Sequence, residues 1–207
     1  SVAAISGGIL AMHDYFDVES DKINAPDRPI PSGAVSPRTA FLFSILLILS
    51  GITLSAFFGD WSVLVALLLG ILGFLYNRFF KKTGLPGNLI VSISVGTTFI
   101  YGGLAVGNPF SPLVLFFAVL VALIDLGEEI AADAMDAEGD ALINSRSIAR
   151  QYGSHHALRM STGIFTIVIL ITPFPFLFGR FNALYAIPLF IMDMFIAWCV
   201  IKLHRNG

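Results

Sequence analysis

The chain has 207 residues, of which 56% are hydrophobic and only 13% are charged, and its formal net charge is −2. Soluble domains carry about 25% charged residues, and a soluble domain of this size cannot bury so large an apolar surface. The composition therefore excludes a soluble enzyme and a disordered chain, and the lack of excess positive charge excludes a nucleic-acid-binding protein. The single cysteine, Cys199, excludes an intrachain disulfide and a multi-cysteine zinc site. These properties predict an integral membrane protein.

Apolar stretches long enough to cross a membrane follow one another along the chain, since a spanning helix needs about 20 residues. In chain order they are residues 40–58, 61–77, 87–106, 111–124, 160–178 and 181–201. The fourth is short, and we expect its helix to continue through the polar run that follows. Residues 1–12 are interpreted as the end of another helix, so the predicted fold is an all-α bundle of transmembrane helices in one domain, residues 1–207. Because the chain begins within apolar sequence, we expect further helices outside it.

The basic residues mark one side of the membrane. If the predicted helices alternate in direction, every lysine and arginine except Arg180 lies on the same face. That face consists of the segments 13–39, 78–86, 126–159 and 202–207. The positive-inside rule makes this face cytoplasmic. The acids are equally one-sided, because all except Asp60 and Asp193 fall into two clusters at this face.

The two acidic clusters contain carboxylates at helical spacing. The spaced residues are His13, Asp17 and Asp21 in the first cluster, and Asp136 and Asp140 in the second, with Asp133 about one turn earlier. Residues four apart lie on one face of a helix, and like charges so placed repel each other. Oxygen ligands without cysteine favour Mg²⁺ or Ca²⁺, and Mg²⁺ usually completes its octahedron with water and substrate phosphate. The two clusters therefore predict a diphosphate held through bridging Mg²⁺.

Both clusters resemble the signature motifs of a known family. The run from His13 to Gly33, HDYFDVESDKINAPDRPIPSG, is similar to the first aspartate-rich motif of the UbiA-type intramembrane prenyltransferases, including its N-x-P-x-R-P tail. The run from Glu129 to Ser147, EIAADAMDAEGDALINSRS, resembles their second motif and looks most like the archaeal members that make ether lipids. The resemblance implies nine transmembrane helices around a central cavity, of which about seven would be present here. The segment 76–88 resembles the cytoplasmic loop between the motifs.

The resemblance also implies a reaction and the residues that carry it. The reaction is Mg²⁺-dependent transfer of a prenyl group from an allylic diphosphate to an acceptor, in the cell membrane, with the active site on the cytoplasmic side. The implied catalytic residues are Asp17, Asp21, Asp133, Asp136 and Asp140. The implied metal ligands are His13, Asp17, Asp21, Asp136 and Asp140. The implied substrate-binding residues are Lys22, Arg28, Tyr76, Lys81, Asn88 and Arg146. The archaeal-like motif favours geranylgeranyl diphosphate as donor and geranylgeranylglyceryl phosphate as acceptor, with an aromatic acceptor of quinone or haem biosynthesis as the alternative.

Departures from the family pattern keep other hypotheses open. The leading Asn of the first motif is His13 here, and the usual Gly and Thr of the second motif are Asn144 and Ser147. Because Mg²⁺ prefers oxygen ligands to imidazole, a catalytically impaired homologue is one alternative. A divalent-cation transporter would also gather carboxylates, but near the bilayer midplane rather than at helix ends. No residue stands out as a catalytic base, and His155 and His156 are interpreted as the polar surface of a loop.

Overall fold

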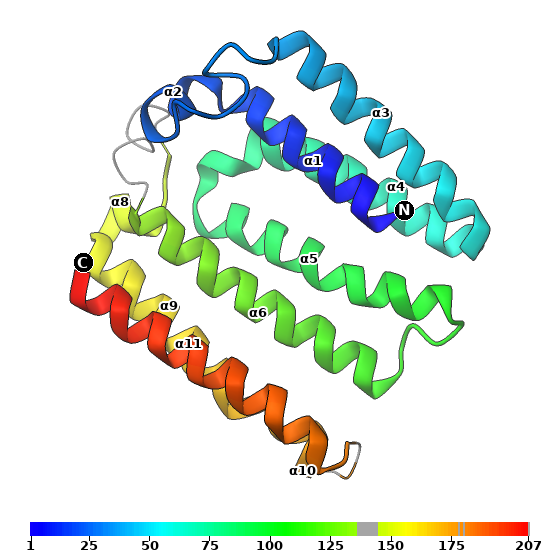
Figure 1. Ribbon diagram of the computed structural model, residues 1–207, viewed down its shortest axis with the longest axis vertical. Coiled ribbons are helices and arrows are strands. Elements are labelled where there is room, and N and C mark those ends of the chain that lie inside the picture. The colour runs from blue at the N-terminus through cyan, green and yellow to red at the C-terminus, as the bar shows by residue number, and fades with distance from the viewer. Residues whose placement is uncertain (136–144, 178, 180, 207) are drawn as a thin grey trace.

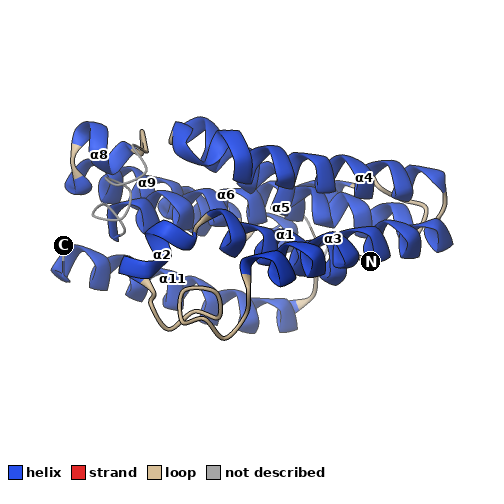
Figure 2. Ribbon diagram, turned by 90° about the horizontal axis from the view of Figure 1, so that it is seen from above, coloured by secondary structure: helices blue, strands red, loops and turns tan. Residues whose placement is uncertain are grey.

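The computed structural model describes residues 1–135, 145–177, 179 and 181–206, and its regular elements within these ranges are all helical. The α-helices are α1 (Val2–Phe16), α2 (Val18–Asn24), α3 (Pro37–Ser55), α4 (Asp60–Leu75), α5 (Leu85–Ala105), α6 (Pro112–Met135), α8 (Ile148–Tyr152), α9 (Ser154–Ile171), α10 (Phe174–Leu177) and α11 (Ala186–Asn206). Short helical turns are η1 (Ala56–Phe58), η2 (Tyr76–Phe80), η3 (Lys81–Thr83) and η4 (Ala183–Tyr185). Figures 1 and 2 show the long helices running roughly parallel or antiparallel to one another. The predicted all-α bundle is confirmed.

A helix is present at each of the six predicted spans, and all except the fourth, in α6, are long and apolar enough to cross a membrane. The segments long and apolar enough to cross it are Pro37–Phe58, Asp60–Thr83, Leu85–Ala105, Ser154–Leu177 and Ala183–Leu203. As expected, α6 starts in the short apolar stretch and continues through the acids that follow as one helix of 24 residues. Large apolar side chains such as Leu46, Trp61 and Phe190 are exposed on the outside of the bundle. Such a surface requires a hydrocarbon environment, and the chain is an integral membrane protein.

Two segments that were predicted as loops are helical instead. Residues 78–83, predicted to follow the span 61–77 as a loop, instead continue α4 within a π turn (Tyr76–Phe80) and a 3₁₀ turn (Lys81–Thr83). No glycine or proline interrupts this run, so the helical turns persist until Gly84, where φ is +72°. The other loop prediction was also wrong, because His155 and His156 lie in the first turn of α9. Gly153, with φ at +89°, separates this helix from α8 and allows it to begin before the apolar residues.

The helices pack as two groups. In one group α1 packs against α3 and α4, and in the other α5, α6 and α9 pack in succession, with α11 against α9 (Figure 1). The close approach of α1 and α3 depends on Gly8, because a Cβ atom there would lie only 2.8 Å from the backbone oxygen of Ser44. Small residues at crossing points are typical of transmembrane helix interfaces. The helix α4 also packs against α5 and so joins the two groups, and residues of α1, α4, α5 and α6 line a cavity between them.

Candidate active site

A cavity of about 640 Å³ lies between the two helix groups. Its acidic and basic lining residues are accompanied at one end by Tyr76, Asn77 and Asn88, and they are His13, Asp17, Asp21, Arg28, Lys81, Asp125, Glu129 and Asp133. The uncharged polar residues Ser6, Ser94, Thr98 and Tyr101 line other parts of the cavity. From the charged end the cavity extends along α1 past Ile9 and Ile5, and along α5 past Val91 and Val95. A charged head region is therefore continuous with an apolar shaft. This combination suits an amphiphilic ligand with a charged head and a long apolar tail.

Basic side chains neutralise the carboxylates on the wall formed by α1 and α2. Asp17, at the junction of the two helices, is 7% exposed and accepts a hydrogen bond from Lys81 Nζ. Asp21 is 6% exposed, and its Oδ2 and Oδ1 atoms lie 2.9 and 3.1 Å from Arg28 Nη1. Arg28 also approaches Asp14 Oδ1 at 3.3 Å. Each buried carboxylate thus has a cationic partner, as the cost of burying an isolated charge requires.

The break between α1 and α2 at Asp17 does not disturb the helical spacing of the first acidic cluster, called here the first ladder (His13, Asp17 and Asp21). The backbone nitrogen of Asp21 donates to the carbonyl oxygen of Asp17 at 2.8 Å, so helical spacing is kept across the junction. His13, Asp17 and Asp21 consequently lie on the same wall of the cavity. The four-residue spacing in the sequence correctly placed these three side chains together.

His13 lies beyond the apolar residues 1–12 and contacts the pair formed by Lys81 and Asp17. Its Nε2 atom is 3.0 Å from Lys81 Nζ and 3.1 Å from Asp17 Oδ2. Burial, followed by the nearby charges of Lys81 and Arg28, lowers the pKa of His13 to about 3. The imidazole is therefore neutral, and its contact with Asp17 is not an ion pair. Because an ammonium group can only donate, Nε2 accepts a hydrogen bond from Lys81.

Uncharged donors hold the acids on the opposite wall, formed by α6. Asn88 Nδ2 donates to Asp133 Oδ2 at 2.9 Å, and Ser92 Oγ donates to Asp125 Oδ2 at 3.0 Å. Both donors lie on α5, one helical turn apart, and both are buried, at 3% and 2% exposure. Glu129 lies between the two aspartates in the sequence and also lines the cavity. Of these residues, only Asp133 and Asn88 have roles predicted from the sequence.

The signal that could have found Asp125 and Glu129 is their spacing. Together with Asp133 they occupy every fourth position on α6, the same pattern that identified the first ladder. Ser92 carries no such signal, because its role depends on how α5 packs against α6. The predicted ladder residues Asp136 and Asp140 lie outside the described residues.

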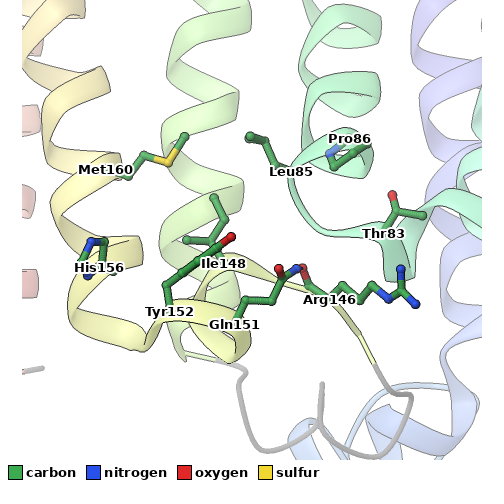
Figure 3. A pocket seen from close by; sticks show the side chains of 9 residues that line it. All are labelled: Thr83, Leu85, Pro86, Arg146, Ile148, Gln151, Tyr152, His156 and Met160. Atoms are coloured by element: carbon green, nitrogen blue, oxygen red, sulfur yellow. The ribbon is translucent and has the colours of Figure 1, made fainter.

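The other predicted substrate-binding residues are divided between the cavity and its surroundings. Tyr76 lines the cavity, whereas Lys22 lies on the exposed face of α2, 2.7 Å from Glu19. Arg146 lines a separate cavity of about 460 Å³ beside the start of α5 (Figure 3). Its backbone nitrogen donates to the Lys82 carbonyl at 2.9 Å. Gly84 permits this approach, because a Cβ atom there would collide with the carbonyl oxygen of Arg146.

The donor set fits a Mg²⁺ ion that shares its ligands with a phosphate group. Asp17 and Asp21 supply carboxylate oxygens from one wall, and Asp133 faces the cavity from the other. Within the described residues, no group of three or more His, Cys, Asp or Glu side chains is placed to hold a metal ion. Mg²⁺ commonly takes only one or two carboxylates and completes its shell with water and phosphate oxygens. The site is therefore suited to a metal–diphosphate complex rather than to a metal held only by these side chains.

Fold and site together define an α-helical membrane protein with a cavity for a charged, amphiphilic ligand. The chain belongs to the UbiA prenyltransferase family, because the model of that family matches residues 1–207. The chain is 36% identical over 196 residues to the digeranylgeranylglyceryl phosphate synthase of Methanococcus aeolicus, covering 95% of this chain and 69% of that relative. The chain spans about two thirds of the length of the curated relatives it matches.

Solved structures agree with this family membership. One, reported for digeranylgeranylglyceryl phosphate synthase in membranes, is 29% identical with a TM-score of 0.70, and the match covers 98% of this chain and 71% of that one. Another is a UbiA homologue from Archaeoglobus fulgidus bound to GPP and Mg²⁺, with 14% identity and a TM-score of 0.75. That match covers 99% of this chain and 73% of the homologue, and at such low identity it establishes the fold.

Proposed function

We propose that this protein transfers a geranylgeranyl group from geranylgeranyl diphosphate to geranylgeranylglyceryl phosphate, releasing diphosphate, in the synthesis of membrane ether lipids. The observation that carries this proposal is the cavity, in which a head region rich in carboxylates and cations joins an apolar shaft. The names of the curated relatives supply the donor and acceptor classes. The lipid nature of both substrates is consistent with a site enclosed by transmembrane helices.

The head region provides the partners that an allylic diphosphate needs. Asp17 and Asp21 would hold Mg²⁺ from the first wall, and Asp136 and Asp140 of the second motif are proposed as the ligands from the other side. When bound, Mg²⁺ neutralises the diphosphate and makes it a better leaving group. Lys81 and the other cations of the cavity would then contact phosphate oxygens, which are good acceptors for charged donors. Arg28 is the second such cation.

The shaft accommodates the prenyl chain and keeps the reacting carbon away from water. The part of α1 that lines it, from Val2 to His13, is about 16 Å long at 1.5 Å per residue. Ionisation of the donor places positive charge on an allylic carbon, and an aromatic ring can stabilise such a cation by about 0.5–2 kcal/mol. Tyr76 lines the charged end of the cavity and is the aromatic side chain proposed for this role.

The proposed location is the cell membrane, with the charged end of the cavity at the cytoplasmic face. The support is the positive-inside rule, because the basic segments all join the helices at that end. A cation transporter is disfavoured by the same distribution, since its acids would be expected near the bilayer midplane.

The experiment that tests this function is a prenyl-transfer assay with purified protein in lipid vesicles. Labelled geranylgeranyl diphosphate is offered with geranylgeranylglyceryl phosphate and, separately, with 4-hydroxybenzoate, each in Mg²⁺ or in EDTA. The proposal predicts a doubly prenylated lipid that forms in Mg²⁺ and not in EDTA. Product with 4-hydroxybenzoate alone would move the assignment to an aromatic acceptor, and absence of both products would overturn prenyl transfer.

A further inference from the structure

We propose that Glu129 is the proton acceptor of the transfer reaction: its carboxylate takes the proton of the glycerol hydroxyl that attacks the prenyl group. The assignment rests on the proposed function and gives a role to Glu129, the first residue of the second motif, for which the sequence predicted none. It follows from the geometry of the α6 wall, where Glu129 lines the cavity between Asp125 and Asp133.

Transfer to a hydroxyl group requires that a proton be removed. The bond between C1 of the prenyl group and the diphosphate oxygen breaks, and its electron pair leaves with the diphosphate. A lone pair of the acceptor oxygen forms the new bond to C1, and the O–H proton must then depart to leave a neutral ether. A positioned base accelerates such steps by about 10²–10⁴-fold. A carboxylate in the wall of the cavity is placed to accept this proton.

Glu129 is the α6 acid whose carboxylate is available for this task. Asp125 accepts a hydrogen bond from Ser92, and Asp133 accepts one from Asn88. Each of these bonds occupies an acceptor lone pair of its carboxylate. Glu129 has no hydrogen bond or ion pair to any other residue in the part of the chain that the structure describes. Its lone pairs are therefore open to a hydroxyl group in the cavity.

The surroundings of Glu129 favour uptake of a proton near neutral pH. This residue lies past the apolar stretch of α6, and burial raises the pKa of its carboxyl to about 7, with further contributions from Asp125, Asp133 and Glu128 on the same helix. Lys81 opposes the shift. A base works best when its pKa is close to the working pH.

Among the described residues, the elements packed against Glu129 add no further charge. The α5 residues Asn88 and Ser92 are uncharged, and the α6 face that packs on α8 and α9 is apolar around Ile130. Across the cavity, Asp17 and Asp21 are paired with cations.

Lys81 and His13, which also line the cavity, are already engaged. Lys81 donates to Asp17 as an ammonium group, and the Nε2 atom of His13 accepts from Lys81. Neither offers a free lone pair to the acceptor hydroxyl. Glu129 thus combines access to the cavity, an unengaged carboxylate and a suitable proton affinity.

The test compares Glu129→Gln and Glu129→Asp with a matched control, Glu128→Gln, whose side chain is exposed at the adjacent position. In lipid vesicles, Glu129→Gln should lower kcat roughly 100-fold while the KM for geranylgeranyl diphosphate stays within about threefold of the wild-type value. Wild-type kcat should fall as pH drops below about 7, because the protonated carboxyl cannot accept a proton. This acid limb should be absent from Glu129→Gln and present at a lower rate in Glu129→Asp. In Glu128→Gln it should persist at the wild-type rate and move to slightly lower pH, because Glu128 no longer raises the pKa of Glu129.

Difference infrared spectroscopy provides a readout that does not depend on turnover. A protonated-carboxyl band that titrates near neutral pH should be present in the wild-type protein and missing from Glu129→Gln. The assignment is overturned if Glu129→Gln keeps a kcat within about threefold of wild type, or if it keeps the acid limb. Those results would leave the proposed function intact. If the wild-type protein forms no ether product, the proposed function fails and the role of Glu129 fails with it.

Discussion

Both walls of the cavity carry buried or half-buried carboxylates, but the partners that hold these carboxylates differ between the two walls. On the α1–α2 wall, Asp17 and Asp21 pair with Lys81 and Arg28. On the α6 wall, the aspartates accept hydrogen bonds from the neutral side chains of α5. The first wall can therefore exchange its cations for a metal-bound diphosphate without leaving a buried charge unpaired. The second wall keeps its negative charge, which attracts a metal ion or a proton.

The largest effect is expected from removing one carboxylate of the first wall. Asp17→Asn keeps the shape of the side chain but removes the charge that would hold Mg²⁺. We expect a loss of transfer activity of about 10³-fold, comparable with removal of a main electrostatic group from an active site. The assay is Mg²⁺-dependent prenyl transfer, with Glu19→Gln on the exposed face of α2 as the control. Activity within tenfold of wild type would show that this wall does not bind the metal.

A smaller effect is expected from breaking the cationic pairing of the same wall. Lys81→Met removes a half-buried ammonium group from Asp17 and His13. Loss of a charged hydrogen bond costs about 1.5–3 kcal/mol, so the prenyl diphosphate should bind about tenfold or more weakly. Divalent metal without diphosphate should bind more tightly, because Asp17 no longer has a competing partner. Calorimetry with Mn²⁺ and with the diphosphate measures both.

The control for this variant is Lys82→Met, at the adjacent exposed position, which should change neither affinity. If Lys81→Met binds the prenyl diphosphate and Mn²⁺ as tightly as the wild type, Lys81 does not move from Asp17 to the diphosphate.

A third variant tests whether the neutral hydrogen-bond donors of α5 are needed on the second wall. Asn88→Ala removes the donor that orients Asp133. Loss of such a supporting contact typically lowers metal affinity or activity by about 10–100-fold, and we expect the lower end because Asp133 keeps its place on α6. The assay is kcat at saturating Mg²⁺, compared with thermal stability in detergent. Equal losses in Asn88→Ala and in an Asn88→Asp variant, which cannot donate from its carboxylate, would support the role of the donor. Full activity of both would refute it.

The smallest effect is expected at Arg28. Its side chain is 43% exposed, whereas that of Lys81 is 21% exposed, so water and salt screen its pairing with Asp21 more strongly. Exposed ion pairs contribute about 0–1 kcal/mol, and Arg28→Gln should weaken diphosphate binding by no more than about fivefold. Binding should also depend on ionic strength less in this variant than in the wild type. If Arg28→Gln weakens diphosphate binding more than Lys81→Met does, Arg28 rather than Lys81 is the more important cation for the diphosphate.

Helix positions and the first ladder could be predicted because they depend on local patterns. The lengths of the apolar runs placed the spans, and the spacing of His13, Asp17 and Asp21 placed three side chains on one wall. The contact between His13 and Lys81 joins residues 68 positions apart, and that between Ser92 and Asp125 joins residues 33 positions apart. Such contacts depend on helix packing, which no local pattern reveals.

Arg146 is a residue whose position the local sequence pattern did not predict correctly. The motif that contains it predicts a phosphate partner, but its backbone is held at Lys82 and its side chain lines the smaller cavity. The close approach that Gly84 allows at this point is a property of the folded chain. The predicted metal role of His13 likewise competes with its hydrogen bond from Lys81.

The most direct measurement is an experimental structure of the protein in lipid with Mn²⁺ and an unreactive thio analogue of geranylgeranyl diphosphate. We predict that the anomalous signal of the metal lies between the Asp17–Asp21 wall and α6, with Lys81 turned from Asp17 to a phosphate oxygen and the prenyl chain along the shaft. A diphosphate bound in the smaller cavity beside Arg146, or a metal elsewhere with the contact between Lys81 and Asp17 intact, would contradict it.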